Sequence, residues 1–300
     1  MADVAFNSEF VAAARAESRR HLLSRLAVYG FLTIFALLYL LPLAVVIANS
    51  FRSLPEITHN GLIALPHSLS LAAWPQAWAH FCVSGACAGI QRNFYNSLMM
   101  TIPATIISTL LGAINGYVLS KWRFRGANAL FACITLGVFM PGQIALMPWA
   151  FILGLLHLSN TVYGLIVVHV AQGLSFTTLF CRNYYVNIPD DLIKAARIDG
   201  AGFWRIFFKI VVPLSPPILI VTVIWQFTGI WNEYLFGVVF TSGSQQPVTA
   251  ALVALSTSQM NARAYDVASA AVLIGALPPL LIYFFGGRYF VRGLTQGAIK

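Results

Sequence analysis

Few side chains in this sequence could do acid–base, metal or phosphate chemistry, and they are scattered. The six histidines and four cysteines show no His-x-x-x-His or Cys-x-x-Cys spacing, which a metal site would need. None of the lysines follows a glycine, whereas a phosphate-binding P-loop requires Gly-Lys followed by Ser or Thr. The sequence therefore predicts no catalytic residue, no metal and no cofactor bound by this chain.

The densest cluster of charges lies in the stretch PDDLIKAARIDGAGFWRIFFKIVVP, between two long apolar runs. Pro189 suits the first position of a helix, and Asp190 and Asp191 complement the positive end of its dipole. Gly200 stands where a C-terminal cap belongs, one turn after Ala196, and the lack of bulk on that face allows another backbone to approach. The stretch predicts a short docked helix, whose partner is either another protein or the chain's own helices.

Composition indicates the surroundings of this segment. Hydrophobic residues make up 59% of the chain, charged residues only 9%, and the mean hydropathy is +0.78. Soluble domains carry about 25% charged residues, so the chain is expected to be an all-α polytopic membrane protein.

Charge-free runs predict where the chain crosses the bilayer, because a spanning helix needs about 20 apolar residues. The longest run, residues 126–181, dips in polarity at HLSNT and is expected to turn there. Prolines in the third, fifth and sixth spans are expected to kink them. Six transmembrane helices are predicted, at about 26–49, 94–119, 127–154, 161–183, 211–234 and 268–288.

Lysine and arginine predict the orientation, since they remain on the cytoplasmic side of short loops. With both termini cytoplasmic, fifteen of the eighteen Lys and Arg residues lie inside, and only Arg52, Arg92 and Arg263 lie outside. The charged stretch then joins the fourth and fifth helices on the cytoplasmic side. A nucleic-acid partner is not expected, because the charges are divided among four separate segments.

The sequence KAARIDG, followed nine residues later by IVVP, resembles the Glu-Ala-Ala loop of the permease subunits of ATP-binding-cassette importers. Five positions match that pattern: Ala195, Ala196, Gly200, Ile210 and Pro213. Two positions depart from it, because Lys194 stands where the family usually has Glu, and Val212 replaces Leu.

Further segments resemble the carbohydrate importers of that family and cover about residues 90–300. They are FYNSLMMTI (94–102), GYVLSKWRFRG (116–126), MPGQIALMP (140–148), TGIWNEYLF (228–236) and RYFVRGLTQGAIK (288–300). The last of these is similar to the tail of the smaller maltose-type subunit.

The resemblance implies a type I importer permease fold with a cytoplasmic coupling helix between helices 4 and 5. It also implies a sugar substrate, a second homologous permease subunit, an external solute-binding protein and two ATPase subunits, which carry the ATP and magnesium. The complex would lie in the inner (cytoplasmic) membrane of a bacterial cell, in contact with the lipid bilayer.

The same resemblance assigns roles to individual residues. Contacts that couple the chain to the ATPase are expected from Asp191, Lys194, Ala195, Ala196, Asp199 and Gly200. Further contacts are expected from the tail, at Thr295, Gln296 and Gly297. Lys194 would meet either an acid on the ATPase or water.

The expected organisation has five parts. They are a cytoplasmic N-terminal segment (1–25), the first transmembrane helix (26–49), an external loop (50–93), the importer transmembrane core (94–288) and a cytoplasmic tail (289–300).

An ion-coupled secondary transporter or channel is the alternative function. Such transporters usually place ionisable groups near the midplane, whereas the predicted spans hold no Asp, Glu, Lys or Arg there. Glu233 comes closest, beside Asn232 at the outer end of the fifth helix. That pair either bonds to the helix end or contacts the transported sugar.

Cys82 and Cys87 lie in the external loop, on the side of the membrane where disulfides persist in bacteria. A four-residue spacer allows them to pair if the chain turns, and two unpaired thiols are the alternative. A cysteine pair at this place also resembles the glucose and mannose members of the family, which implies glucose, mannose or another small sugar as substrate.

Overall fold

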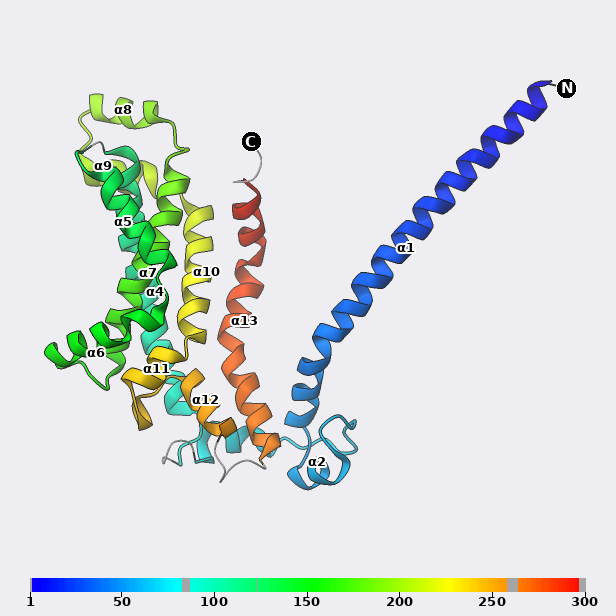
Figure 1. Ribbon diagram of the computed structural model, residues 1–300, viewed down its shortest axis with the longest axis horizontal. Coiled ribbons are helices and arrows are strands. Elements are labelled where there is room, and N and C mark those ends of the chain that lie inside the picture. The colour runs from blue at the N-terminus through cyan, green and yellow to red at the C-terminus, as the bar shows by residue number, and fades with distance from the viewer. Residues whose placement is uncertain (1, 83–86, 123, 258–263, 297–300) are drawn as a thin grey trace.

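The computed structural model describes residues 2–82, 87–122, 124–257 and 264–296, and the regular elements in these ranges are helices (Figure 1). The long helices are α1 (Ala2–Ser50), α4 (Gln91–Lys121), α7 (Val162–Tyr185), α10 (Pro216–Asn232) and α13 (Tyr265–Gln296). The shorter α-helices are α2 (Leu54–Asn60), α3 (Ala73–Pro75), α5 (Ala127–Phe139), α6 (Leu146–Leu155), α8 (Asp190–Ile198), α9 (Phe203–Ile206), α11 (Leu235–Phe240) and α12 (Val248–Thr257). Short 3-10 or π turns complete them: η1 (Gln76–His80), η2 (Gly142–Ala145), η3 (Phe207–Val211) and η4 (Gly243–Gln245).

Within the described residues, four helical segments are long and apolar enough to cross a membrane: His21–Ser50, Gln91–Lys121, Val162–Tyr185 and Tyr265–Gly287. Two of them agree closely with the spans predicted at 94–119 and 161–183. Two further pairs of helices reach the required length only together, so this part of the chain holds at most six crossings, and the predicted count stays a prediction.

The third predicted span differs from the structure because it is not one continuous helix. Helix α5 and the segment Gly142–Leu155 meet at an angle of 103°. Pro141 lies in the break, and the residue before it, Met140, is extended, as the ring of a following proline favours. The segment predicted as one kinked helix over 127–154 is therefore two helices joined by a sharp bend.

The fifth predicted span is also shorter than expected. Helix α10 begins at Pro216 rather than at residue 211, and it meets the segment Phe203–Val211 at 89°. Pro213 lies in that bend, and Pro216 and Pro217 occupy the first turn of α10, where their missing N–H groups cost no helical hydrogen bond.

Helices α4 and α7 form the centre of the bundle, and α10 packs against both. Two glycines of α4 allow the close approach. A Cβ atom on Gly112 would lie 2.2 Å from the Thr177 hydroxyl, and one on Gly116 would lie 2.6 Å from the backbone nitrogen of Arg182. Small residues at helix contacts are the usual means of packing in membranes, because they bring backbones together.

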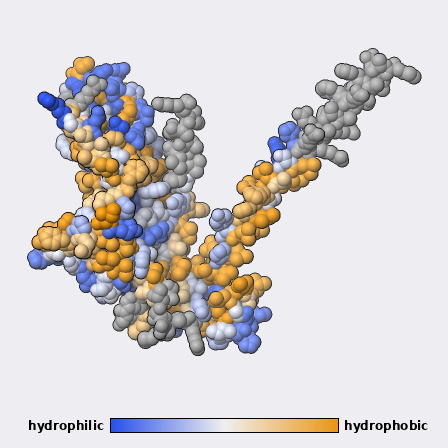
Figure 2. Space-filling view, in the orientation of Figure 1, coloured by the Kyte–Doolittle hydropathy of each residue, from blue (hydrophilic) through white to orange (hydrophobic). Residues whose placement is uncertain are grey.

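Helix α1 stands away from the bundle and meets α13 near its own C-terminal end (Figure 1). Its side chains from residue 21 to 44 are exposed, and they are mostly apolar (Figure 2). An exposed apolar surface of this length is what a helix surrounded by lipid requires.

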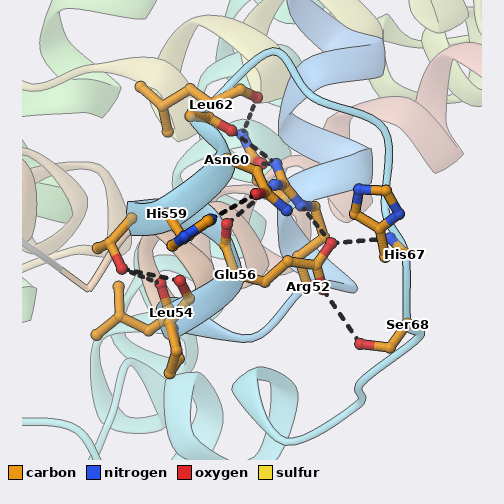
Figure 3. A network of polar contacts seen from close by, with 12 residues as sticks. Arg52, Leu54, Glu56, His59, Asn60, Leu62, His67 and Ser68 are labelled. Atoms are coloured by element: carbon orange, nitrogen blue, oxygen red, sulfur yellow. Dashed lines mark hydrogen bonds and ion pairs between the residues drawn. The ribbon is translucent and has the colours of Figure 1, made fainter.

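Arg52, which follows α1, is fully buried in a network of polar contacts (Figure 3). Its guanidinium donates to Asn49 Oδ1 at 2.8 Å and to the Gly61 carbonyl at 3.0 Å, and it forms an ion pair with Glu56 at 3.1 Å. Arg52 is one of the three basic residues on the minority side of the predicted topology. The ion pair with Glu56 neutralises the charge of Arg52 within the loop, so Arg52 adds no net positive charge on that side.

Glu56 holds the second half of the same loop. Its carboxylate accepts hydrogen bonds from the backbone N–H of His67 at 2.8 Å and from the Ser68 hydroxyl at 3.1 Å. The bond from the His67 amide, with those from Arg52 and Ser68, lowers the pKa of Glu56 below its ordinary value of 4.5. The loop is thus held closed by a charged carboxylate.

Candidate functional site

The first part of the charged stretch singled out in the sequence forms α8, which lies across one end of the bundle (Figure 1). The last turns of α13 reach the same end, whereas α2, α11 and α12 lie at the opposite one. Asp190 and Asp191 occupy the first turn, as predicted. Pro189 stands one position earlier than expected: it is the N-cap, with extended ψ, rather than the first helical residue.

Gly200 ends α8 as the sequence predicted. Its φ of +76° is left-handed, a conformation that glycine adopts without strain. Its N–H donates to the Arg197 carbonyl at 3.0 Å, and the N–H of Ala201 donates to the Ala196 carbonyl at 2.9 Å. These two bonds form a Schellman motif, which satisfies the last carbonyls of the helix.

The inner face of α8 packs on the chain itself. Ile193 is buried in a cluster that includes Ile188, Tyr185 and Phe207, and Ala196 is half-buried against the same cluster. Gly200, in contrast, is exposed and has nothing within 4 Å of where a Cβ would be. The predicted face of small residues is therefore divided, because Ala196 turns toward its own bundle and Gly200 toward the outside.

Lys121, the last residue of α4, braces the start of α8. Its side chain is only 3% exposed, and its ammonium donates to the Ile188 carbonyl at 2.6 Å and to Asp190 Oδ1 at 2.7 Å. The carbonyl of Val186 lies at 3.5 Å from the same nitrogen. One cation therefore ties the end of α4 to the segment that enters α8.

Arg197 braces the other end of α8 to the same place. Its guanidinium donates to the Lys121 carbonyl at 3.4 Å and lies 4.3 Å from the centre of the Trp122 ring. Trp122 in turn packs against Phe203, with ring centres 5.3 Å apart. Both ends of α8 are thus held to α4, although the chain joins α8 directly to α7 and α9.

The outer face of α8 is open and mixed in character. Asp191, Leu192, Ala195 and Ile198 are exposed on it, and Ile198 is 86% exposed. Exposed apolar side chains beside carboxylates suit a surface that another protein covers. We call these four residues the α8 outer face.

Lys194 forms an ion pair with Asp191 at 3.0 Å, within the same helix. Their side chains are 70% and 91% exposed, so the pair contributes at most about 1 kcal/mol. Asp199 is also exposed. The lysine in place of the family's glutamate is therefore directed to its own helix in this structure.

Sequence reasoning missed five residues of this site: Lys121, Trp122, Arg197, Leu192 and Ile198. The first two lie about 70 residues before α8, and no local pattern connects them to it. A signal for the last two was present, since α8 carries isoleucine or leucine at three positions that cannot all face inward on one helix.

The remaining candidate residues lie elsewhere. Glu233 caps α11, because both of its carboxylate oxygens accept from the Phe236 N–H, at 2.9 and 3.0 Å. Asn232 is exposed at the end of α10. Cys82 and Cys87 are joined in a disulfide. In the tail, Thr295 and Gln296 fall in the last turn of α13, and Gly297 lies outside the described residues. Within the described ranges, no three His, Cys, Asp or Glu side chains gather as a metal site would require.

Known proteins resemble this chain over most of its length. Residues 93–296 match the family described as the binding-protein-dependent transport system inner membrane component. A probable ABC transporter permease protein of Pyrococcus horikoshii is 45% identical over 187 residues, which are 62% of this chain and 67% of that protein. The diacetylchitobiose uptake system permease protein NgcG of Streptomyces coelicolor is 30% identical over 273 residues, which are 91% of this chain and 88% of that one.

Among solved structures, the chain resembles one from a bacterial ABC transporter involved in the import of the acidic polysaccharide alginate. The TM-score is 0.74 and the sequence identity 22%, over 87% of this chain and 94% of that one. A likeness at this identity shows that the two chains share a fold.

Proposed function

The chain belongs to the family of binding-protein-dependent transport system inner membrane components, and from this premise we propose that it is the permease subunit of an ATP-driven sugar importer. The fold class predicted from the sequence, an all-α membrane protein with the type I importer permease fold, is confirmed by the family match and the shared fold. The ion-coupled alternative is not favoured by either.

One observation carries the proposal most directly: the chain holds a short helix firmly at one end of its bundle while leaving that helix's outer face open. Helix α8 is anchored by Ile193 on its inner face and by Arg197 in its last turn, and Lys121 of α4 holds its first turn. A helix that only covered the bundle would not need exposed Leu192 and Ile198. The arrangement suits a coupling helix, which transmits a movement of the partner protein to α4.

The partner at this face is an ATPase subunit in our proposal. Two such subunits bind the ATP and magnesium, a second homologous permease completes the path, and an external solute-binding protein delivers the sugar. The contacts from this chain come from the α8 outer face, from Lys194, Asp199 and Gly200, and from the tail near Thr295. The excess of Lys and Arg at the predicted inner side supports cytoplasmic termini and an inner-membrane location.

The substrate is a sugar, and glucose or mannose is our first expectation. The similar protein NgcG is named for the uptake of diacetylchitobiose, which supports a carbohydrate as the substrate of this chain. The disulfide between Cys82 and Cys87 supports the narrower choice, because a cysteine pair at this place resembles the glucose and mannose importers.

The test is a substitution on α8 with a matched control. Gly200→Trp places a bulky, strained residue just after the exposed end of α8. Gly243→Trp makes the same change in η4, next to α11 and far from α8 along the chain. Both glycines have positive φ and nothing within 4 Å of a Cβ position, so the two variants bear comparable strain.

We expect Gly200→Trp to abolish ATP-dependent uptake of labelled glucose and mannose by the reconstituted complex and to reduce co-purification of the ATPase subunits. Gly243→Trp should retain the ATPase subunits, and both variants should insert into the membrane in normal amounts. Normal uptake by Gly200→Trp would refute the coupling role.

A further inference from the structure

Two stacked aromatic rings, one half-buried and the other exposed, lie on the side of the bundle where α7 and α10 pack together. The rings of Phe176 in α7 and Trp225 in α10 have centres 5.1 Å apart and planes only 13° apart. Trp225 is nonetheless 53% exposed, although its neighbours Gln226 and Phe227 are buried. Since one face of the indole is covered by Phe176, the exposure belongs to its other face and its edges.

The depth of Trp225 in the bundle is unusual for an exposed tryptophan. It lies nine residues after the start of α10 and seven before its end, which at 1.5 Å per residue places it about 14 Å and about 10 Å from the two ends. Tryptophan in membrane proteins gathers at the two interfaces, where its N–H reaches water. An indole N–H that faced hydrocarbon at this depth would lack a partner.

The rest of this face of α10 leaves room beside the indole. Gly229, one turn further, is exposed and has nothing within 4 Å of a Cβ position. Asn232 follows on the same face, seven residues after Trp225, and its side chain is exposed. On α7, Gln172 is half-buried one turn before Phe176. The face thus combines a flat aromatic surface, an open position and two amide side chains.

We propose that this face of α7 and α10 binds a pyranose ring of the transported sugar. The C–H face of a pyranose packs on a flat aromatic ring, which Trp225 presents, and Gly229 leaves the space that the sugar occupies. The hydroxyl groups then meet amides, which both donate and accept hydrogen bonds, at Asn232 and Gln172. The inference rests on the proposed function, and it assigns sugar contact to this subunit as well as to any partner.

The experiment compares substitutions that separate a sugar platform from a lipid-facing or subunit-facing role. Trp225→Leu keeps an apolar side chain that suits lipid or a second permease subunit but removes the flat ring, whereas Trp225→Phe keeps a flat ring. Gly229→Leu fills the open position, where a Cβ atom would meet nothing within 4 Å. Phe284→Ala is the control, because Phe284 is an exposed aromatic of α13 on another part of the bundle.

Each variant is assembled with its partner subunits, the amount of intact complex is measured, and uptake is assayed with labelled glucose, mannose, maltose and diacetylchitobiose. We expect Trp225→Leu and Gly229→Leu to lower kcat/KM for uptake about tenfold or more, which is typical of a lost contact in a substrate pocket. Trp225→Phe should stay within about threefold of the wild type, and Phe284→Ala should match it.

Three results would overturn the proposal. The first is an unchanged kcat/KM in Trp225→Leu or Gly229→Leu, which would indicate lipid or a subunit on this face. The second is an equal loss in Trp225→Leu and Trp225→Phe. The third is a wild-type complex that takes up none of these sugars with ATP, and this result alone would also refute the proposed function. If the Trp225→Leu variant does not assemble with its partner subunits, uptake by the Gly229→Leu variant decides whether the proposal stands.

Discussion

Lys121 offers the sharpest test of how α8 is held. Replacing it with methionine keeps a long apolar side chain but removes the ammonium that donates to the Ile188 carbonyl and to Asp190. Losing the donor to a buried carbonyl costs about 1–3 kcal/mol. The ion pair adds less than about 1 kcal/mol, because Asp190 is more than half exposed to water.

A net cost of about 2 kcal/mol changes the local opening of α8 about thirtyfold, since each 1.4 kcal/mol is a factor of ten. The cost should appear as local release rather than as global unfolding, because Ile193 and the core of α4 and α7 are untouched. We expect the amide hydrogens of residues 186–201 to exchange about thirtyfold faster in the purified complex. Sugar transported per ATP hydrolysed should fall.

Lys194→Met is the matched control, because Lys194 also pairs with an aspartate of the first turn of α8 but is largely exposed. Its exchange rates should change by less than about threefold, as a surface pair is worth little. Equal exchange in Lys121→Met and Lys194→Met, or no change in either, would refute the reasoning that the α4 brace holds α8.

Three further predictions concern packing, pH and the disulfide. Gly112→Ala should cost about 1–3 kcal/mol and lower the Tm, because its Cβ would overlap α7, whereas Gly154→Ala, with open space around it, should not; equal Tm values would contradict the packing. The lowered pKa of Glu56 means that its carboxylate stabilises the loop above its ordinary pKa of 4.5, and that this stabilisation is lost as the pH falls through the lower folded value. Proteolysis of residues 51–72 should therefore rise below about pH 4.5 in the wild type, and a cleavage rate independent of pH would exclude this. Replacing both Cys82 and Cys87 with serine should cost about 2 kcal/mol for so short a ring, and a reductant should lower the wild-type Tm but not that of the double variant; a reductant without effect on the wild type would show that the bridge is absent or contributes nothing.

The local parts of the fold were predictable because local patterns determine them. The runs without charge predicted the helices that became α4 and α7 to within three residues at each end, and the polar dip at HLSNT predicted the turn between α6 and α7. Gly200 was recognised as the end of α8 because a left-handed residue after a helix is most easily a glycine.

The parts that depend on distant contacts were not predictable in the same way. Pro141 signalled a kink, but the angle of 103° depends on how the following helix packs. The link from Lys121 to Asp190 crosses 69 positions of sequence and has no periodic signal. The resemblance placed Ala196 among the ATPase contacts, whereas in the structure Ala196 is half-buried against the cluster that holds Ile193.

Transport by the assembled complex tests the central claim most directly. Proteoliposomes that contain this chain with its partner permease, its ATPase subunits and the solute-binding protein are assayed for uptake of labelled glucose and mannose. The account predicts uptake that requires ATP and the binding protein and does not respond to a proton or sodium gradient. Uptake driven by an ion gradient without ATP would contradict it.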